Sequence, residues 1–520
     1  MRVLSAVLVA VLLAAPWLVQ SLVVCAWLGV AAALVIVTRV EGRARFFWIE
    51  AVTLIATAIA FHWSPEVFAE TMDSSYAVGV AMFLPFLVWD ATRAALPFWF
   101  AGIFARTPQS AWLPAGLLAV VLEAVVPSVF PWRFGYTQIA WPWTLQAVDL
   151  FGPGWSTLMV FAHAGAILFL GKACYDAARS SRLLPLPLSV MASAARSSPA
   201  VWLCFINLLY SAVAIHYWNG QIQSSPSIQV ALVQVDPGFI ESSNDLRRLT
   251  KTVSRKVDLV CWPESSGGSY ESGLDGFSDP ERIVALSREP NRGLRPWENP
   301  DCELLLAGKL YSGDPVAPTL LYQSAMLIDR QERITGRYHK RHLMPFGEYA
   351  PGANWLPAMS RMFLQDDVIT SGDQPTVLPA ACGAKLGVML CYEDMVPEAA
   401  RSLTERSANL LVSLINGSAF PNRLTLAQHR LLAQLRAVEC RRYFVRCAAT
   451  GETCVISPLG EIESSLPVQH EGVLSANVAL LEVRPLYCQL GRMFPWLCSL
   501  GLAFYVWRAT RTRPGQPSCG

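Results

Sequence analysis

The sequence is poor in charge. Only 15% of its 520 residues are Asp, Glu, Lys or Arg, whereas 53% are hydrophobic; a typical soluble domain carries about 25% charged residues. This shortage excludes a chain that is soluble along its whole length. The charges are sparse up to about residue 217, dense from about 227 to 482, and sparse again from 493 to 507. The composition therefore predicts a membrane part and a polar part in one chain.

The sequence also lacks a charge excess of either sign. Its formal net charge is +2, which argues against a nucleic-acid partner, because nucleic-acid-binding domains usually carry a strong basic face. The 13 cysteines form no CxxC pair and no Cys/His spacing of the zinc type, and their number is odd. Cys440, Cys447 and Cys454 are spaced by seven, and we expect core residues there rather than a disulfide. No repeat and no low-complexity tract is present.

Apolar runs are abundant, by contrast. Eight of them approach the length that crosses about 30 Å of hydrocarbon. They cover residues 3–18, 22–38, 47–63, 77–100, 112–126, 155–171, 201–217 and 493–507. The first two, broken at Pro16, predict a helical hairpin. A signal peptide is the alternative for the first run, since Arg2 precedes a short apolar stretch, but a second apolar run follows at once and no small-residue cleavage site precedes a polar start.

The charges in the short loops predict the orientation, because Lys and Arg stay on the cytoplasmic side. With the amino terminus inside, the inside loops and the tail hold Arg39, Arg43, Arg45, Arg106, Lys172, Arg179, Arg182, Arg196, Arg508, Arg511 and Arg513. The opposite loops hold Glu66, Glu70, Asp73 and Arg133. This asymmetry places the polar region outside the cytoplasm.

The polar region alternates short apolar β runs with helical stretches, which is typical of an α/β layered domain. The β runs begin at about residues 228, 257, 303, 384, 408 and 443, and a helix is expected over 427–441. We therefore expect transmembrane helices 1–7 in residues 1–220, an extracytoplasmic domain in 221–490, and a last transmembrane helix with a cytoplasmic tail in 491–520.

Three ionisable residues stand at or soon after the ends of β runs, where α/β sheets usually place their sites. Glu264 ends "LVCWPES", Lys340 lies in "RYHKRHLMPFGEYAP", and Cys391 opens "CYEDMVPE". A nearby cation such as Lys340 is expected to stabilise the Cys391 thiolate, while Glu264 takes the thiol proton as general base. Lys340 and backbone N–H groups after Cys391 would then hold an oxyanion. A single Cys after an apolar strand is more often a core residue, and a single Lys or Glu in a loop is more often a surface residue. The prediction of an active site therefore depends on the three sequence contexts together.

Those contexts resemble the Glu, Lys and Cys motifs of the carbon-nitrogen hydrolase superfamily, and "HLMPFGEY" resembles its apolipoprotein N-acyltransferase branch. "FPWRFGYTQ" from Phe130, "IQVALVQVDPG" at the domain start and "LRAVECRRYFVR" from Leu435 resemble further parts of that branch. The resemblance covers about residues 113–495. It implies a polytopic α-helical membrane protein of about eight transmembrane helices that carries an extracytoplasmic nitrilase-like α/β domain, an αββα sandwich.

The resemblance also implies roles. Glu264 would be the general base, Lys340 the stabiliser of the intermediate and Cys391 the acylated nucleophile. Glu348 would join the carboxylate network and Glu393 would position the thiol, with a structural salt bridge as the alternative for each. Tyr392 would orient the nucleophile or line the pocket. A buried ion-pair scaffold is expected from Arg436, Glu439, Arg442 and Arg446.

The implied reaction moves a fatty acyl group from a phospholipid to Cys391 and then to the α-amine of a diacylated lipoprotein cysteine, by a ping-pong route. It needs no ATP, coenzyme A or metal. We expect a monomer in the bacterial inner membrane, with the catalytic domain periplasmic and no nucleic-acid partner. Four aromatic residues have two possible roles: they line the entry for the acyl donor, or they form an aromatic belt at the membrane interface. They are Phe134, Tyr136, Trp141 and Trp143.

The chain departs from the family pattern at three places. Gly417 and Ala419 in "NGSAF" replace an Asp and a Trp, "CAATGET" from Cys447 replaces an Asn-rich turn, and the aromatic after the first strand is at best Phe239. The departures leave donor preference and acceptor identity open. A membrane-tethered amidase or nitrilase, an acyltransferase for another amine, and a non-enzymatic lipid-binding paralogue remain as alternative hypotheses.

Overall fold

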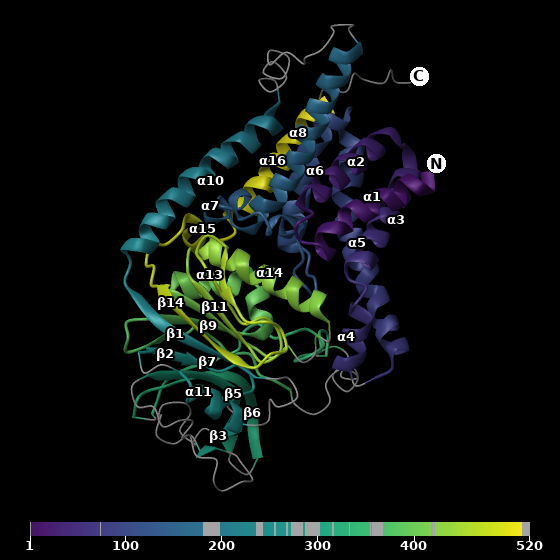
Figure 1. Ribbon diagram of the computed structural model, residues 1–520. Coiled ribbons are helices and arrows are strands. Elements are labelled where there is room, and N and C mark those ends of the chain that lie inside the picture. The colour runs from purple at the N-terminus through teal and green to yellow at the C-terminus, as the bar shows by residue number, and fades with distance from the viewer. Residues whose placement is uncertain are drawn as a thin grey trace. The chain divides into compact units, whose positions relative to one another are not determined.

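The computed structural model describes residues 2–511 except 73, 180–197, 236–242, 254–255, 267–268, 272–283, 286–301, 315–316, 332, 354, 356–367, 418–419 and 421. Phe239 and Ala419 therefore lie outside the described residues. The chain divides into two compact units (Figure 1). The helical unit comprises Met1–Ser64, Ala81–Ile215 and Leu490–Gly520, and the sheet unit comprises Pro65–Val80 and His216–Gln489.

Each of the eight predicted apolar runs lies on a helix. These helices are α1 (Arg2–Leu18), α2 (Val23–Arg39), α3 (Gly42–Ala60), α5 (Tyr76–Phe104), α6 (Pro108–Val125), α8 (Pro153–Arg179), α10 (Pro199–Ser224) and α16 (Met493–Arg511). Between α6 and α8 the chain forms the 3-10 turns Phe134–Gln138 and Pro142–Thr144 and the short helix α7 (Val148–Phe151).

Length and apolar composition separate these helices into groups. Within the described residues, four are long and apolar enough to cross a membrane, namely α5, α6, α8 and α10, and α3 with α4 (Ser64–Thr71) makes a fifth if this bent pair is one span. The helices α1 and α2 are apolar but shorter. The helical unit is compatible with a membrane protein, and the count of eight spans stays a prediction.

Small residues bring the helices of this unit close together. A Cβ atom on Gly165 of α8 would lie 2.5 Å from the ring of Trp112 in α6, and one on Gly116 of α6 would lie 3.0 Å from Phe161 in α8. Glycine at such crossings lets helix backbones approach without a side chain between them, a frequent device where lipid supplies no hydrophobic drive for helix association.

Two β-sheets form the sheet unit. The first pairs its strands in the order β14-β1-β2-β5-β3-β4, with β6 and β7 following from β5, and the second in the order β13-β12-β11-β10-β9-β8. The first uses β1 (Ser227–Gln234), β2 (Leu259–Cys261), β3 (Ser269–Glu271), β4 (Val284–Ala285), β5 (Glu303–Asp314), β6 (Ala317–Ile328), β7 (Ile334–His339) and β14 (Gly472–Ala479). The second uses β8 (Val377–Pro379), β9 (Lys385–Leu390), β10 (Leu410–Ile415), β11 (Phe444–Ala448), β12 (Cys454–Ile456) and β13 (Ile462–Ser465).

The sheets face each other and helices cover their outer faces. The thiol of Cys447 on β11 lies within hydrogen-bonding distance of the carbonyls of Val233 on β1 and Cys261 at the end of β2, so this core residue joins the two sheets. Helix α11 (Ser243–Thr250) packs in one core with β1, β2 and β5, and helices α13 (Pro397–Glu405) and α14 (Arg423–Cys440) pack in another with β9, β10 and β11. Figure 1 shows α11 and α13 with α14 on opposite sides of the sheets. This arrangement is the four-layer α/β/β/α architecture.

The strand pairing brings the expected site together. Strands β1, β2 and β5 are parallel, and so are β9, β10 and β11. Parallel strands end at the same edge of their sheet. The residues that follow β2, β9 and β10 therefore meet at one end of the sandwich.

Candidate active site

The side chains of Glu264, Lys340 and Cys391 meet in the sheet unit, although 76 and 51 positions separate them along the chain. The Lys340 Nζ lies 3.7 Å from Glu264 Oε1, and the Cys391 thiol hydrogen-bonds the Glu264 carboxylate. Glu264 and Lys340 are buried, at 5% and 1% exposure, whereas Cys391 is partly exposed. The two charged groups are therefore more shielded from water than Cys391.

The Glu264 carboxylate is held from several sides. Its Oε2 accepts a 3.1 Å hydrogen bond from the Asn416 N–H, at the end of β10, and its Oε1 accepts one from the Gln323 side chain at 3.4 Å. Burial raises the pKa of Glu264 above its ordinary value; the Lys340 ammonium opposes this shift and the Glu348 charge adds to it. A carboxylate with a raised pKa is a better proton acceptor.

The Lys340 ammonium is bracketed by carboxylates. Its Nζ donates to Glu348 Oε1 at 2.5 Å, and Glu348 Oε2 accepts the Met344 N–H at 2.7 Å. Burial lowers the pKa of Lys340, but the charges of Glu348, Glu264 and Cys391 outweigh burial and raise it above its ordinary value. Lys340 is therefore a permanent cation and not a proton acceptor. Glu348 lies in the carboxylate network and also forms a salt bridge.

The surroundings of Cys391 favour its protonated thiol. Burial and the Glu264 charge raise its pKa well above the ordinary value, and only the Lys340 cation opposes them. Lys340 therefore favours the thiolate, while burial and the nearby carboxylates favour the protonated thiol. Proton removal by Glu264 must then accompany the attack on the substrate.

The backbone at this site is strained. Cys391 has φ 47°, Ser265 directly after Glu264 has φ 64°, and Phe346 beside Glu348 has φ 64°. Non-glycine residues rarely adopt this region, and such outliers cluster at functional sites. The turn at Cys391, between β9 and a 3-10 helix (Cys391–Met395), leaves the thiol at the strand end.

Glu393 connects the segment after Lys340 with the strand before Cys391. Its Oε1 accepts the Tyr338 hydroxyl and the N–H groups of Arg341 and His342 at 2.6, 2.8 and 3.0 Å. Its Oε2 accepts the Leu390 N–H at 2.9 Å. These four donors are hydroxyl and backbone groups, so Glu393 positions two segments rather than forming the salt bridge that was its alternative. Tyr392, beside it, is buried, and burial raises its pKa.

The chain is similar to several known proteins. The carbon-nitrogen hydrolase family matches residues 229–487. Apolipoprotein N-acyltransferase of Geobacter metallireducens is 27% identical over 528 residues, which cover 98% of this chain and 95% of that protein. Apolipoprotein N-acyltransferase of Pseudomonas putida is 27% identical over 84% of each chain.

Residues 229–487 of the chain form a carbon-nitrogen hydrolase domain. Among solved structures, Saccharomyces cerevisiae Nit3, a member of branch 10 of the nitrilase superfamily, covers 52% of this chain and 95% of its own, with 20% identity and a TM-score of 0.35.

The sequence reasoning missed one cluster in the carbon-nitrogen hydrolase domain. Asp394, three residues after the nucleophile, accepts from His429 Nε2 at 2.5 Å, from Ser413 Oγ at 3.2 Å and from Arg446 at 3.5 Å, and is fully buried. Burial alone would raise its pKa, but His429 and Arg446 lower it below the ordinary value. The cluster ties the 3-10 helix that begins at Cys391 to α14. A His pointing inward from α14 was the available signal.

The four residues expected as an ion-pair scaffold are fully buried, but they do not all form ion pairs. Arg436 binds Glu439 at 2.7 Å and Arg446 binds Asp394. Arg442 instead donates to the carbonyls of Ala408 and Val483, both at 2.7 Å, and burial lowers its pKa to about 10. The expectation of an ion pair is wrong for Arg442, because its guanidinium donates to backbone carbonyls instead.

Two of the departures from the family pattern touch each other. A Cβ atom on Gly417 would lie 2.4 Å from the Thr450 carbonyl oxygen, so no side chain fits at this position. Gly417 follows Asn416, whose N–H binds Glu264 and whose carbonyl accepts the Cys391 thiol at 3.8 Å. Gly417 of "NGSAF" therefore packs against Thr450 of "CAATGET" beside the nucleophile.

The remaining predicted residues can be placed in the helical unit. Tyr136 is buried, and Trp141 and Trp143 stack with ring centroids 5.4 Å apart. Phe134 lines a pocket described below. Within the described residues, no three His, Cys, Asp or Glu side chains group as metal ligands would, and Cys440, Cys447 and Cys454 are free and buried.

Proposed function

We propose that this protein transfers a fatty acyl group from a membrane phospholipid to the N-terminal amine of a diacylated lipoprotein cysteine, through a thioester on Cys391. The observation that carries the proposal is the contact of carboxylate, ammonium and thiol at Glu264, Lys340 and Cys391. The similarity to apolipoprotein N-acyltransferases over 98% of the chain supports lipoprotein N-acylation as its activity.

The first half-reaction loads the enzyme. Glu264 takes the thiol proton while the Cys391 sulfur attacks the ester carbonyl carbon of the phospholipid. The oxyanion forms beside the Lys340 ammonium, which stays charged throughout. When the intermediate collapses, the ester C–O bond breaks, and the lysophospholipid oxygen takes the proton from Glu264. The products are the acyl thioester and a lysophospholipid.

The second half-reaction discharges it. The lipoprotein amine attacks the thioester carbonyl carbon and loses a proton to Glu264, and the oxyanion again lies beside Lys340. Collapse breaks the C–S bond, and the Cys391 sulfur regains the proton from Glu264. Glu348 keeps the ammonium in place, and Glu393 keeps the segments of Lys340 and Cys391 in register.

The apolar helices support a membrane location, where the acyl donor resides. The excess of Lys and Arg in alternate loops favours an inner-membrane protein whose sheet unit lies on the periplasmic side. We propose a monomer, since every residue that the reaction uses comes from one sheet unit of one chain.

A single assay tests the proposal. Purified protein in phospholipid micelles is incubated with a synthetic diacylated lipopeptide that bears a free α-amine, and the peptide mass is followed. The expected result is a mass gain of one fatty acyl group that is absent with Cys391→Ala. Without the lipopeptide, Cys391 itself should gain the acyl mass and lose it to hydroxylamine.

Cys382→Ala is the matched control, because Cys382 is a partly exposed thiol of the same unit outside the site, and it should keep full activity. Cys391-dependent release of free fatty acid without peptide acylation would identify a hydrolase instead. Acylation of other amines with equal rate would identify a different acceptor. Silence in every assay would favour the non-enzymatic paralogue.

A further inference from the structure

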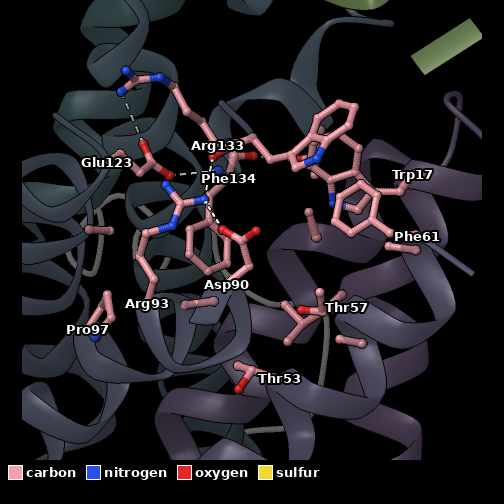
Figure 2. Close-up of a pocket in the computed structure, with 18 of the residues that line it drawn as sticks. Trp17, Thr53, Thr57, Phe61, Asp90, Arg93, Pro97, Glu123, Arg133 and Phe134 are labelled. Atoms are coloured by element: carbon pink, nitrogen blue, oxygen red, sulfur yellow. Dashed lines mark hydrogen bonds and ion pairs between the residues drawn. The ribbon is translucent and has the colours of Figure 1, made fainter. Parts of the chain in front are cut away.

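A pocket lies within the helical unit, and none of the catalytic residues line it (Figure 2). Helices α1, α2, α3, α5 and α6 and the segment after α6 line it, and about 800 Å³ of it is free of protein atoms, counting the part open to the outside.

One edge of the pocket carries four paired charges. Arg93 lies 2.9 Å from Asp90, and Arg133 lies 3.7 Å from Glu123, as the dashed lines in Figure 2 show. All four side chains are at most 13% exposed. Charged side chains between apolar helices are expensive and mark functional sites. Two cations and two anions make an edge without net charge.

The same edge holds a hydrogen-bond donor that the described residues leave unused. Trp132 is 5% exposed and lines the pocket, and its indole N–H has no hydrogen-bond partner among the described residues. Its ring is fixed, because Phe61 stacks on it at 4.8 Å and Trp17 meets it edge-on at 5.2 Å. A buried N–H without a partner is unfavourable, so an acceptor from a ligand fits here.

Much of the remaining lining is built from small residues, with Thr53 and Thr57 of α3 among them. Ala56 and Ala60 of α3 and Ala94 of α5 line the pocket together with Leu13 of α1. Short side chains on facing helices leave the space that an alkyl chain needs. The pocket is therefore amphipathic: a charge-paired edge with a free donor adjoins a lining of mostly apolar side chains.

We propose that this pocket binds one zwitterionic phospholipid. The headgroup phosphate accepts from the Trp132 N–H and faces the guanidinium groups of Arg93 and Arg133, and the headgroup ammonium faces Asp90 and Glu123. An acyl chain lies along α3 and α5. An anionic lipid offers no ammonium to the two carboxylates, so it binds more weakly. This site does not depend on the proposed function, because the Cys391 chemistry plays no part in it.

The test uses full-length Cys391→Ala protein in detergent micelles, so that no acyl transfer through Cys391 can consume the lipid. A phosphatidylethanolamine with a photoactivatable acyl chain is added and irradiated, and the labelled peptides are mapped by mass spectrometry. We expect labelling on α3 and α5, competed by unlabelled phosphatidylethanolamine and much less by phosphatidylglycerol. Labelling absent from these helices, or equal competition by both lipids, would overturn the proposal.

Two variants sharpen the test. Ala56→Leu fills the pocket and should abolish this labelling, whereas Ala51→Leu, on the exposed face of the same helix, should leave it unchanged. Trp132→Phe keeps the ring and removes the N–H, so about 3- to 10-fold more unlabelled lipid should be needed for competition, the cost of one hydrogen bond. The proposal would be overturned if Ala56→Leu and Ala51→Leu changed the labelling equally, or if Trp132→Phe left the competition by unlabelled lipid unchanged. If the Ala56→Leu protein is not monodisperse, the competition measured with Trp132→Phe decides.

Discussion

Replacement of Glu393 by Gln tests how the site is held together. The carboxylate is fully buried and accepts four hydrogen bonds, three on one oxygen and one on the other. A Gln side chain has the same shape, but its amide nitrogen must face either the Leu390 N–H or the other three donors. At least one charge-assisted hydrogen bond, which contributes about 1.5–3 kcal/mol, becomes a donor–donor contact.

The remaining hydrogen bonds become weaker, but the neutral Gln no longer carries the cost of a buried charge. Together we expect the free energy of unfolding to fall by about 2–4 kcal/mol. For a domain of this size, each kcal/mol lowers the unfolding midpoint by about 2–4 °C, so scanning fluorimetry should show a decrease of roughly 4–16 °C. Because the Lys340 segment loses its tie to Cys391, kcat/KM for the lipopeptide should fall about 10- to 100-fold.

Glu405→Gln is the control for this variant. Glu405 is 52% exposed and pairs with Arg401 at 3.1 Å, and such surface pairs contribute at most about 1 kcal/mol. An unfolding midpoint and a turnover for Glu393→Gln that match those of Glu405→Gln would refute the positioning role of Glu393.

Three further predictions follow from the same geometry. Because burial raises the pKa of Glu264, acidification should reduce the activity at a pH above about 4.3, the ordinary pKa of a Glu carboxyl. Loss of activity only near pH 4.3 would contradict this. Glu264→Gln should lower the rate at least about 10²-fold. Alkylation of Cys391 by iodoacetamide should keep accelerating beyond the ordinary thiol range of about pH 8.5, since its pKa is raised, and a plateau near neutrality would show a resting thiolate. Gly417→Ala places a Cβ atom 2.4 Å from the Thr450 carbonyl and should cost about 1–3 kcal/mol in thermal unfolding, whereas Gly220→Ala, in open space on a helix, should be neutral or stabilising.

Much of the fold follows from local patterns. The strands after residues 227, 384 and 408 are continuous apolar runs because both of their faces are covered, and continuous runs of that length are visible in a sequence. The positions of Glu264, Lys340 and Cys391 at or soon after strand ends follow from the same runs. That these three side chains meet required the parallel pairing of the strands, which composition alone does not specify.

Other features depended on contacts between distant segments. From the sequence, Arg133 was interpreted only as a charged residue of a short loop. In the structure it pairs with Glu123, ten residues earlier, at the edge of a pocket. The contact of Asp394 with His429 joins positions 35 residues apart, and no spacing rule links them. The direction of the Cys391 pKa shift depends on burial together with four neighbouring charges, so it is a property of the folded site.

The left-handed backbone at Cys391 has an evolutionary consequence. A residue with a Cβ atom in this region costs about 1–2 kcal/mol, and Gly or Asn would relieve that cost. Mutations that stabilise a fold are easy to reach once activity no longer restrains a position. A chain released from catalysis would drift toward such a replacement, so a cysteine that is still held in this conformation favours an enzyme under selection over a lipid-binding paralogue that has lost turnover.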